Sequence, residues 1–238
     1  MIHQVNIAPE SKRLLRDIVE LQIYVLEAAS IVDVTPDIIY SPETKVTNFG
    51  PILRDHLNTK TRFRDRAEII SNWIIRKKET LLVPLRDYAS ANSADKNQFI
   101  QDIKHDVGLL YSPKRDTFNF AVLEGSPIWK VGAKDFFFKF YDLWDNGFDS
   151  DLFSCSISRE KFSKQQFIYE FMSCNPNLFI CAICDGTAYS ARTSSHIYTS
   201  IEHFFPRSIY PQFSCHPLNL IPICSICNSY IKGDTDPL

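Results

Sequence analysis

The sequence CAIC at residues 181–184 is matched further along the chain by CSIC at residues 224–227. Each is a C-x2-C pair, and the four thiolates of Cys181, Cys184, Cys224 and Cys227 are the ligand set of a closed tetrahedral zinc site. Each pair suits a tight turn that directs both sulfurs at one ion. The segment between the pairs is longer than in a simple zinc ribbon, so we expect the zinc to fasten an inserted substructure.

The insert and its flank carry side chains that could activate water beside a hard cation. Glu202 and His203 lie in the insert, together with Asn219, and Asn228 directly follows the last cysteine. A neutral imidazole can accept a proton from water, while carboxylate and amide oxygens suit Mg²⁺ or Mn²⁺. The pattern therefore suggests a catalytic centre next to the structural zinc.

Two stretches resemble a known family, namely IEHFFPRS at residues 201–208 and NLIPICSICNSYIKGD at residues 219–234. They are similar to the HNH endonucleases, also called ββα-metal or His-Me finger nucleases, in the version held by a CxxC–CxxC zinc. The likeness covers about a quarter of the chain, and extends in particular to HNH proteins of bacterial anti-phage and restriction systems. It implies a zinc-stapled HNH finger at residues 176–238. Because the pattern of residues 1–175 predicts a mostly helical domain, we expect an α+β protein.

The resemblance also implies a role for each motif residue. His203 would be the general base, with its second ring nitrogen held by a carbonyl or carboxylate. Asn219 would bond backbone groups in the loop and orient that base. Glu202 and Asn228 would bind the catalytic Mg²⁺ or Mn²⁺. For Asn228 the alternative is a helix cap; for Glu202 it is a surface acid, since adjacent strand residues share a site only where the strand ends or bulges.

Basic and histidine residues outside the motif receive weaker assignments. Lys232 and Arg207 could contact phosphate, and His196 and His216 are expected to have structural roles rather than to assist the site. A further basic stretch includes Arg76, Lys77 and Lys78. It is either a solvated helix face or a second phosphate-contacting surface.

The implied function is metal-dependent hydrolysis of phosphodiester bonds in DNA, with a cytoplasmic effector of anti-phage defence as one setting. The helical domain would then bind DNA or a protein partner such as an ATPase or a sensor subunit. Two alternatives stay open: a non-catalytic zinc-finger module that binds nucleic acid or protein, and an RNase built on the same finger. The two C-x2-C pairs favour metal over disulfides, and Cys155, Cys174 and Cys215 are expected to be buried or idle thiols.

Composition limits these interpretations. The chain has 238 residues, 45% hydrophobic content and a net charge of −2, so it can form one large or two modest domains. The sequence has no apolar run long enough for a membrane span, so none is expected. Its first residues do not have the pattern of a signal peptide. Residues 176–238 hold three basic and four acidic groups. Because phosphate neutralisation supplies most non-specific affinity, the basic surface must come from elsewhere in the chain or from a partner.

Hydrophobic periodicity predicts five helices before the zinc module, separated by loops such as residues 31–51, which Pro and Gly interrupt. The helices are expected at 9–30, 59–82, 93–109, 133–148 and 158–177. In the module, residues 196–205 and 219–224 are expected to be strands, and residues 225–234 a short helix.

Overall fold

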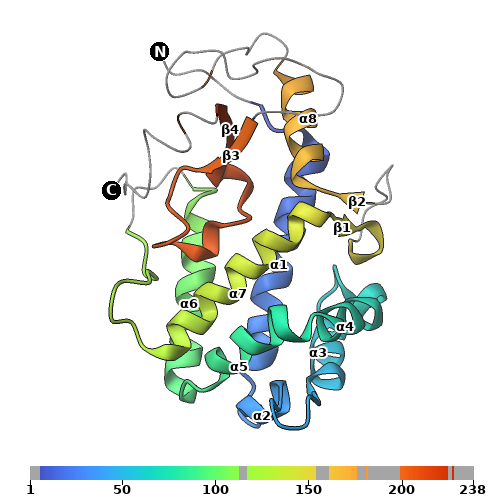
Figure 1. The fold of residues 1–238 in the computed structure, drawn as a ribbon, viewed down its shortest axis with the longest axis vertical. Coiled ribbons are helices and arrows are strands. Elements are labelled where there is room, and N and C mark those ends of the chain that lie inside the picture. The colour runs from blue at the N-terminus through green and yellow to red at the C-terminus, as the bar shows by residue number, and fades with distance from the viewer. Residues whose placement is uncertain are drawn as a thin grey trace.

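The computed structural model describes residues 6–112, 117–153, 161–175, 181, 199–224 and 227. These residues are mostly helical and include two small antiparallel sheets of two strands each, β1–β2 and β3–β4 (Figure 1). The predicted α+β class with dominant helix is confirmed at this level. The expected helix after the second zinc pair lies outside the described residues, apart from Cys227. No helix among the described residues has the length and apolar character needed to cross a membrane.

The first helix, α1 (Pro9–Ala29), is central to the helical region and packs against α3, α5 and α6. Pro9 opens it, at a position where the missing N–H costs no hydrogen bond. Its leucine, isoleucine and valine side chains are buried on more than one face, which is why the helix is enclosed by others. Its bounds agree with the predicted 9–30, and α6 (Ser93–Leu109) agrees with the predicted 93–109, with Asn92 as its N-cap.

The region between α1 and α6 is more broken than predicted. Its elements are α2 (Pro36–Ile39), α3 (Phe49–Asn58), a 3₁₀ turn (Arg64–Arg66), α4 (Ala67–Arg76), a π turn (Lys78–Leu82) and α5 (Val83–Ala89). The prediction of a single helix at 59–82 is wrong. The helix is interrupted at Lys77, whose backbone angles, φ −90° and ψ 39°, are not helical. The apolar stripe that suggested it is nevertheless buried, from Phe63 to Ile74. Helix α3 begins inside the expected loop, since Pro51 falls in its first turn.

The aromatic segment forms α7 (Ile128–Leu143), which starts five residues earlier than the predicted 133–148. Pro127 precedes it, and a 3₁₀ turn ends at Gly147, whose φ of 77° favours glycine. Phe136, Phe137 and Phe140 are buried in the core. Gly132 allows α7 to approach α5 closely: a Cβ there would lie 2.7 Å from the Pro84 carbonyl oxygen.

The helix expected at 158–177 is shorter than predicted. Lys161–Phe162 form β2, which pairs with β1 (Phe148–Asp149), and α8 runs over Lys164–Cys174. Ser163 caps α8 by accepting a hydrogen bond from the Gln166 N–H. The β1–β2 pairing takes Lys161 and Phe162 into an extended conformation, so the helix starts after them.

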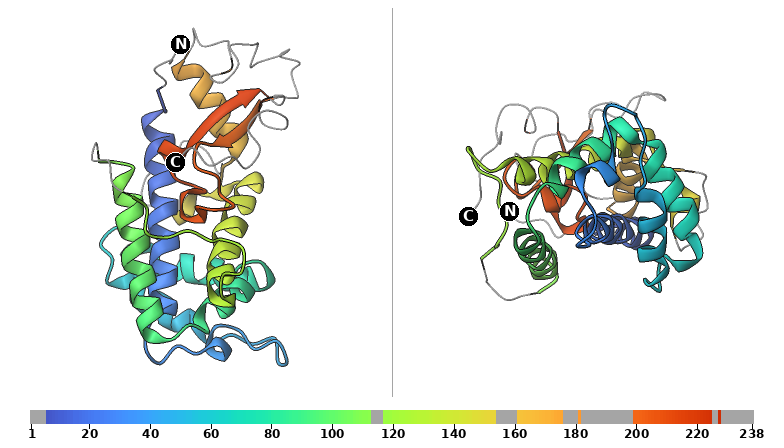
Figure 2. Two further views of the ribbon diagram at one scale, coloured as in Figure 1. Left: turned by 90° about the vertical axis from the view of Figure 1, so that its left-hand side faces the viewer. Right: turned by 90° about the horizontal axis from the view of Figure 1, so that it is seen from below.

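The C-terminal hairpin, β3 (Thr199–His203) and β4 (Leu220–Cys224), lies beside α8 in both side views (Figures 1 and 2). The helices and the hairpin share one core, which includes Cys215 and Leu220 with Ile201 packed against it. The described residues of 199–224 are packed directly on the helices, and the predicted domain boundary after residue 175 stays a prediction.

A buried carboxylate joins the loop of the hairpin to α6. Asp106 accepts hydrogen bonds from the backbone N–H groups of Asn119 and Phe120, at 2.8 and 3.0 Å, and from the side-chain amide of Gln212 at 2.9 Å. Burial raises the pKa of Asp106, and these donors oppose the shift. The loop of the hairpin is also held to the segment between α6 and α7, by the backbone hydrogen bond from the Val122 N–H to the Ile209 carbonyl, 2.9 Å long.

Candidate functional site

The register of the β3–β4 pair separates two groups of candidate residues. His203 pairs with Leu220 at one end, next to Asn219, and Thr199 pairs with Cys224 at the other. Four residue steps at about 3.4 Å each put these ends about 14 Å apart along the strands. The hairpin thus holds the cysteines at one end and the histidine at the other.

The imidazole of His203 is buried and fixed by a main-chain acceptor. Its Nε2 lies 2.9 Å from the carbonyl oxygen of Ser214, and its ring meets the ring of Tyr141 edge-on at 4.8 Å between centroids. A carbonyl can only accept, so Nε2 carries the proton and, in the neutral ring, Nδ1 is the basic nitrogen. Ser214 therefore supplies the kind of partner expected for a general-base histidine.

Asn219 closes the loop between the two strands. Its Oδ1 accepts a hydrogen bond from the Phe205 N–H at 2.7 Å, and its Nδ2 donates to the carbonyls of Phe205 and Phe213, each at 3.1 Å. Its own backbone carbonyl accepts from the Phe204 N–H at 3.0 Å. These bonds fix the loop at two places: directly after His203, and at the residue that precedes Ser214.

Glu202 is half-buried and pairs with Ile221 in a regular register, so β3 has no bulge at this position. Adjacent strand residues leave the strand on opposite faces, which places the Glu202 and His203 side chains on different faces up to the point where β3 ends. Both are nevertheless near Tyr141. Burial raises the pKa of the Tyr141 phenol, Arg207 opposes the shift, and the charge of Glu202 adds a small increase.

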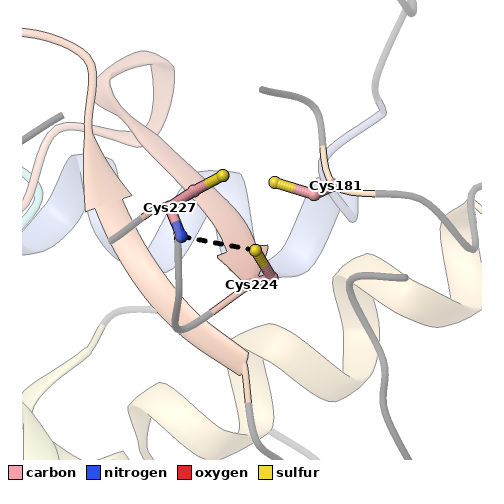
Figure 3. Close-up of side chains that lie close together, drawn as sticks. All are labelled: Cys181, Cys224 and Cys227. Atoms are coloured by element: carbon pink, nitrogen blue, oxygen red, sulfur yellow. Dashed lines mark hydrogen bonds between the residues drawn. The ribbon is translucent and has the colours of Figure 1, made fainter. Parts of the chain in front are cut away.

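Three buried cysteines gather at the other end of the hairpin (Figure 3). The Sγ atoms of Cys181, Cys224 and Cys227 all lie within 4.8 Å of one another, and the Cys227 N–H points at the Cys224 sulfur at 3.4 Å. Sulfurs bound to one zinc ion at about 2.3 Å would be about 3.8 Å apart, so the group fits a tetrahedral thiolate site. This cluster could hold a metal ion. Cys184, the expected fourth ligand, lies outside the described residues.

Several other predicted site residues also lie outside the described residues, namely Asn228, Lys232 and His196. His216 is described: it is buried, its Nδ1 accepts from the Leu218 N–H at 3.2 Å, and its ring packs on Tyr111. Burial lowers the pKa of His216 to about 3, so it is neutral near pH 7. Its described contacts are structural and do not include His203.

The basic residues near the end of α4 are not brought to the hairpin. Arg76 bonds the Asn72 carbonyl, Lys77 lies over the Trp73 ring, and Lys78 bonds the Lys45 carbonyl. Along the long axis, α4 and the hairpin lie in opposite halves of the molecule (Figure 1). Two other cations of this basic stretch, Lys60 and Arg62, form ion pairs with carboxylates of α1.

Arg207, in contrast, contacts the same aromatic ring as His203, that of Tyr141. Its guanidinium is 4.9 Å from the Tyr141 ring centroid, and Lys164 of α8 lies 3.5 Å from the same centroid. Sequence reasoning missed Tyr141, Lys164 and Ser214. The sequence favours a core role for the aromatic run around Tyr141, with a base-stacking platform as the alternative. No motif marks Lys164, whose position depends on how α8 packs against β3.

Comparison with known proteins does not assign a family. No protein-family model matches the chain, and neither the curated proteins nor the solved structures give a match.

Proposed function

We propose that the chain is a metal-dependent HNH-type endonuclease that hydrolyses phosphodiester bonds in DNA. The observation that carries the proposal is the setting of His203: a buried imidazole at the end of β3, with Nε2 on the Ser214 carbonyl and Asn219 bonding the adjoining backbone. This arrangement suits a general base, because the Ser214 carbonyl holds the proton of the neutral ring on Nε2 and makes Nδ1 the basic nitrogen.

In this proposal the residues of the chain divide the work. His203 takes a proton from water through Nδ1, and the bond from Nε2–H to Ser214 grows stronger as the ring becomes charged. Glu202 and Asn228 would hold Mg²⁺ or Mn²⁺, which when bound neutralises charge on the phosphate and the leaving 3′ oxygen. Cys181, Cys184, Cys224 and Cys227 would hold zinc as a structural ion, with every position filled by sulfur.

The biological role that we propose follows from the same resemblance to the HNH endonucleases. The chain would act as the effector of an anti-phage system, and a partner such as an ATPase or sensor subunit would control it. The finger region is close to neutral in charge, so its affinity for DNA has to come from basic groups elsewhere in the chain or on a partner.

A nicking assay on supercoiled plasmid with Mg²⁺ or Mn²⁺ tests the proposal. His203→Gln keeps a side-chain donor for the Ser214 carbonyl but removes the base, so activity should fall by about 100-fold or more. His105→Gln, at an exposed histidine of α6, is the matched control and should retain activity. Thermal unfolding of each variant separates chemistry from folding.

Three results would redirect the assignment. Full activity in His203→Gln removes His203 as the base. Cleavage of RNA with no cleavage of DNA identifies the RNase alternative. Binding of nucleic acid without cleavage by the zinc-loaded wild type supports the binding-module alternative.

A further inference from the structure

One face of α7 carries a row of cations seated on aromatic rings. Lys134, Phe138 and Tyr141 are spaced by four and three residues, so they lie on the same side of the helix. The Lys134 ammonium is 5.4 Å from the Phe138 ring centroid; the Arg207 guanidinium is 4.8 Å from Phe138 and 4.9 Å from Tyr141. The Lys164 ammonium is 3.5 Å from Tyr141. We call Lys134, Arg207 and Lys164 the cation row.

The cation row joins three separate segments of the chain and leads to the proposed general base. Lys134 belongs to α7, Arg207 to the turn after β3, and Lys164 is the first residue of α8. At the Tyr141 end, the same ring that seats Arg207 and Lys164 also contacts His203. An anion bound along the row would therefore extend towards that imidazole.

The acidic neighbours of the row are exposed and weakly held. Asp142 lies 3.5 Å from Arg207 and is 50% exposed; Asp145 lies 3.0 Å from Lys164 and is 62% exposed. An exposed ion pair such as Arg207–Asp142 contributes about 0–1 kcal/mol, so a phosphate can replace the Asp142 carboxylate at little cost. Lys164 itself is only 15% exposed. Burial lowers the pKa of its amine and Asp145 opposes the shift, so a second anion would be a favourable partner.

We propose that the cation row binds successive phosphates of the DNA strand that enters the His203 site. This rests on the proposed function and adds Lys134 and Lys164 as positioning residues outside the motif. It also gives the near-neutral finger a source of positive charge, because two of the three cations come from the helical region. The rings keep the three long side chains in place, which reduces the entropy lost when they bind phosphate.

Binding is measured in the cleavage-deficient His203→Gln protein, with a fluorescent DNA duplex over a range of salt concentrations. Lys134→Met, Arg207→Met and Lys164→Met keep an apolar stem on each ring and remove the charge. Each should weaken binding and lower the slope of log K against log salt by about one, and the triple variant by about three. Lys139→Met, at an exposed lysine elsewhere on α7, is the control and should leave the slope unchanged.

Steady-state cleavage by the single variants in the wild-type background gives a second readout. Phosphate contacts away from the reacting atoms should raise KM several-fold and leave kcat nearly unchanged. A purely structural role for the row would instead lower the thermal midpoint and the active fraction, without changing the salt slope.

The failures of the two proposals are distinguishable. Unchanged slopes in all three variants, or no binding of the parent to DNA, overturn the cation row. Row-dependent binding without any cleavage by the wild type supports the row and rejects the nuclease. Cleavage that depends on His203 but not on the row supports the nuclease alone.

Discussion

The side-chain amide of Asn219 satisfies three backbone groups at once, in a loop that would otherwise leave them buried and unpaired. A typical hydrogen bond contributes about 1 kcal/mol to stability, but an unsatisfied buried partner costs about 1–3 kcal/mol. Both the oxygen and the nitrogen of the amide are used here: Oδ1 accepts a hydrogen bond from the Phe205 N–H, and Nδ2 donates to two carbonyls. No other side chain of this size offers the same combination.

We therefore predict that Asn219→Asp destabilises the protein by about 2–3 kcal/mol, because it places a carboxylate oxygen against the two carbonyls. Asn219→Ser, which keeps one donor, should cost less. Urea unfolding measures both. If Asn219→Asp were as stable as the wild type, the assigned amide orientation would be wrong.

The sequence could single out individual residues of the HNH-like motif, but not the residues that contact His203 in the fold. His203 and Asn219 could be singled out because they lie in the two stretches that resemble the HNH endonucleases. Tyr141, Lys164 and Ser214 could not be, because their relation to His203 exists only after α7, α8 and the hairpin have packed together.

Among the elements, α1, α3 and α6 are joined by one carboxylate. Glu27 of α1 accepts hydrogen bonds from His56 of α3 at 2.9 Å, Lys60 at 2.6 Å and Lys104 of α6 at 2.6 Å. Burial alone would raise the pKa of Glu27, but these donors outweigh it and hold the pKa at about 2. The ionised form is therefore favoured by the fold.

The sign of this shift predicts acid sensitivity. The folded-state pKa lies below the ordinary value of 4.5, so the stabilisation is complete above about pH 4.5 and is lost as the pH falls towards 2. Glu27→Gln should lower the unfolding free energy at pH 7 by about 2 kcal/mol, since the partly exposed lysines can regain water.

The exposed Glu43 gives the matched control, and Glu43→Gln should be neutral. Denaturant unfolding at pH 7 and at pH 3 checks both variants. The difference between wild type and Glu27→Gln should shrink at pH 3, and a constant difference would contradict the linkage.

Periodicity identified α1 and α6 well because each has a continuous apolar pattern and a clear start. It failed at 59–82 and 158–177, where tertiary contacts break the helix. Phe63 turns in to pack on Tyr24 of α1, and Lys161 pairs with Asp149 across β1–β2. Such breaks depend on partners distant in sequence, so no local pattern predicts them.

For the whole molecule, the shared core determines what loss of metal should do. The His203 end of the hairpin belongs to the main core, whereas Cys181, Cys224, Cys227 and Ile223 form a small separate cluster. If this cluster holds a metal ion, we expect the cysteine end to depend on the ion for its stability far more than the helices do.

Cys224→Ser should reduce bound zinc from one ion per chain to none and increase hydrogen exchange at β4, while far-UV circular dichroism keeps most of the helical signal. Cys174→Ser, at an exposed cysteine of α8, is the control and should keep its zinc. Global unfolding of Cys224→Ser would show that the helices also depend on the metal, and retention of zinc would reject the thiolate site.

The separation of α4 from the hairpin gives a prediction about DNA length. If Arg76, Lys77 and Lys78 form a second DNA contact, reversing their charges to Glu should weaken binding to a duplex of about 40 base pairs. A duplex of about one helical turn, bound at the hairpin, should be affected much less. Equal binding of the long duplex by wild type and variant would restore the solvated-face interpretation.

The bond between Asp106 and Gln212 spans 106 residues of sequence, and this affects the order in which the chain can assemble during synthesis. A ribosome releases α6 long before Gln212, so the nascent helices must wait without the hydrogen bond that Gln212 donates to Asp106. Final closure of the helical region comes only when the C-terminal segment docks. A chain that stops before β3 should for this reason remain loosely packed and depend on chaperones, even though it contains every helix from α1 to α8.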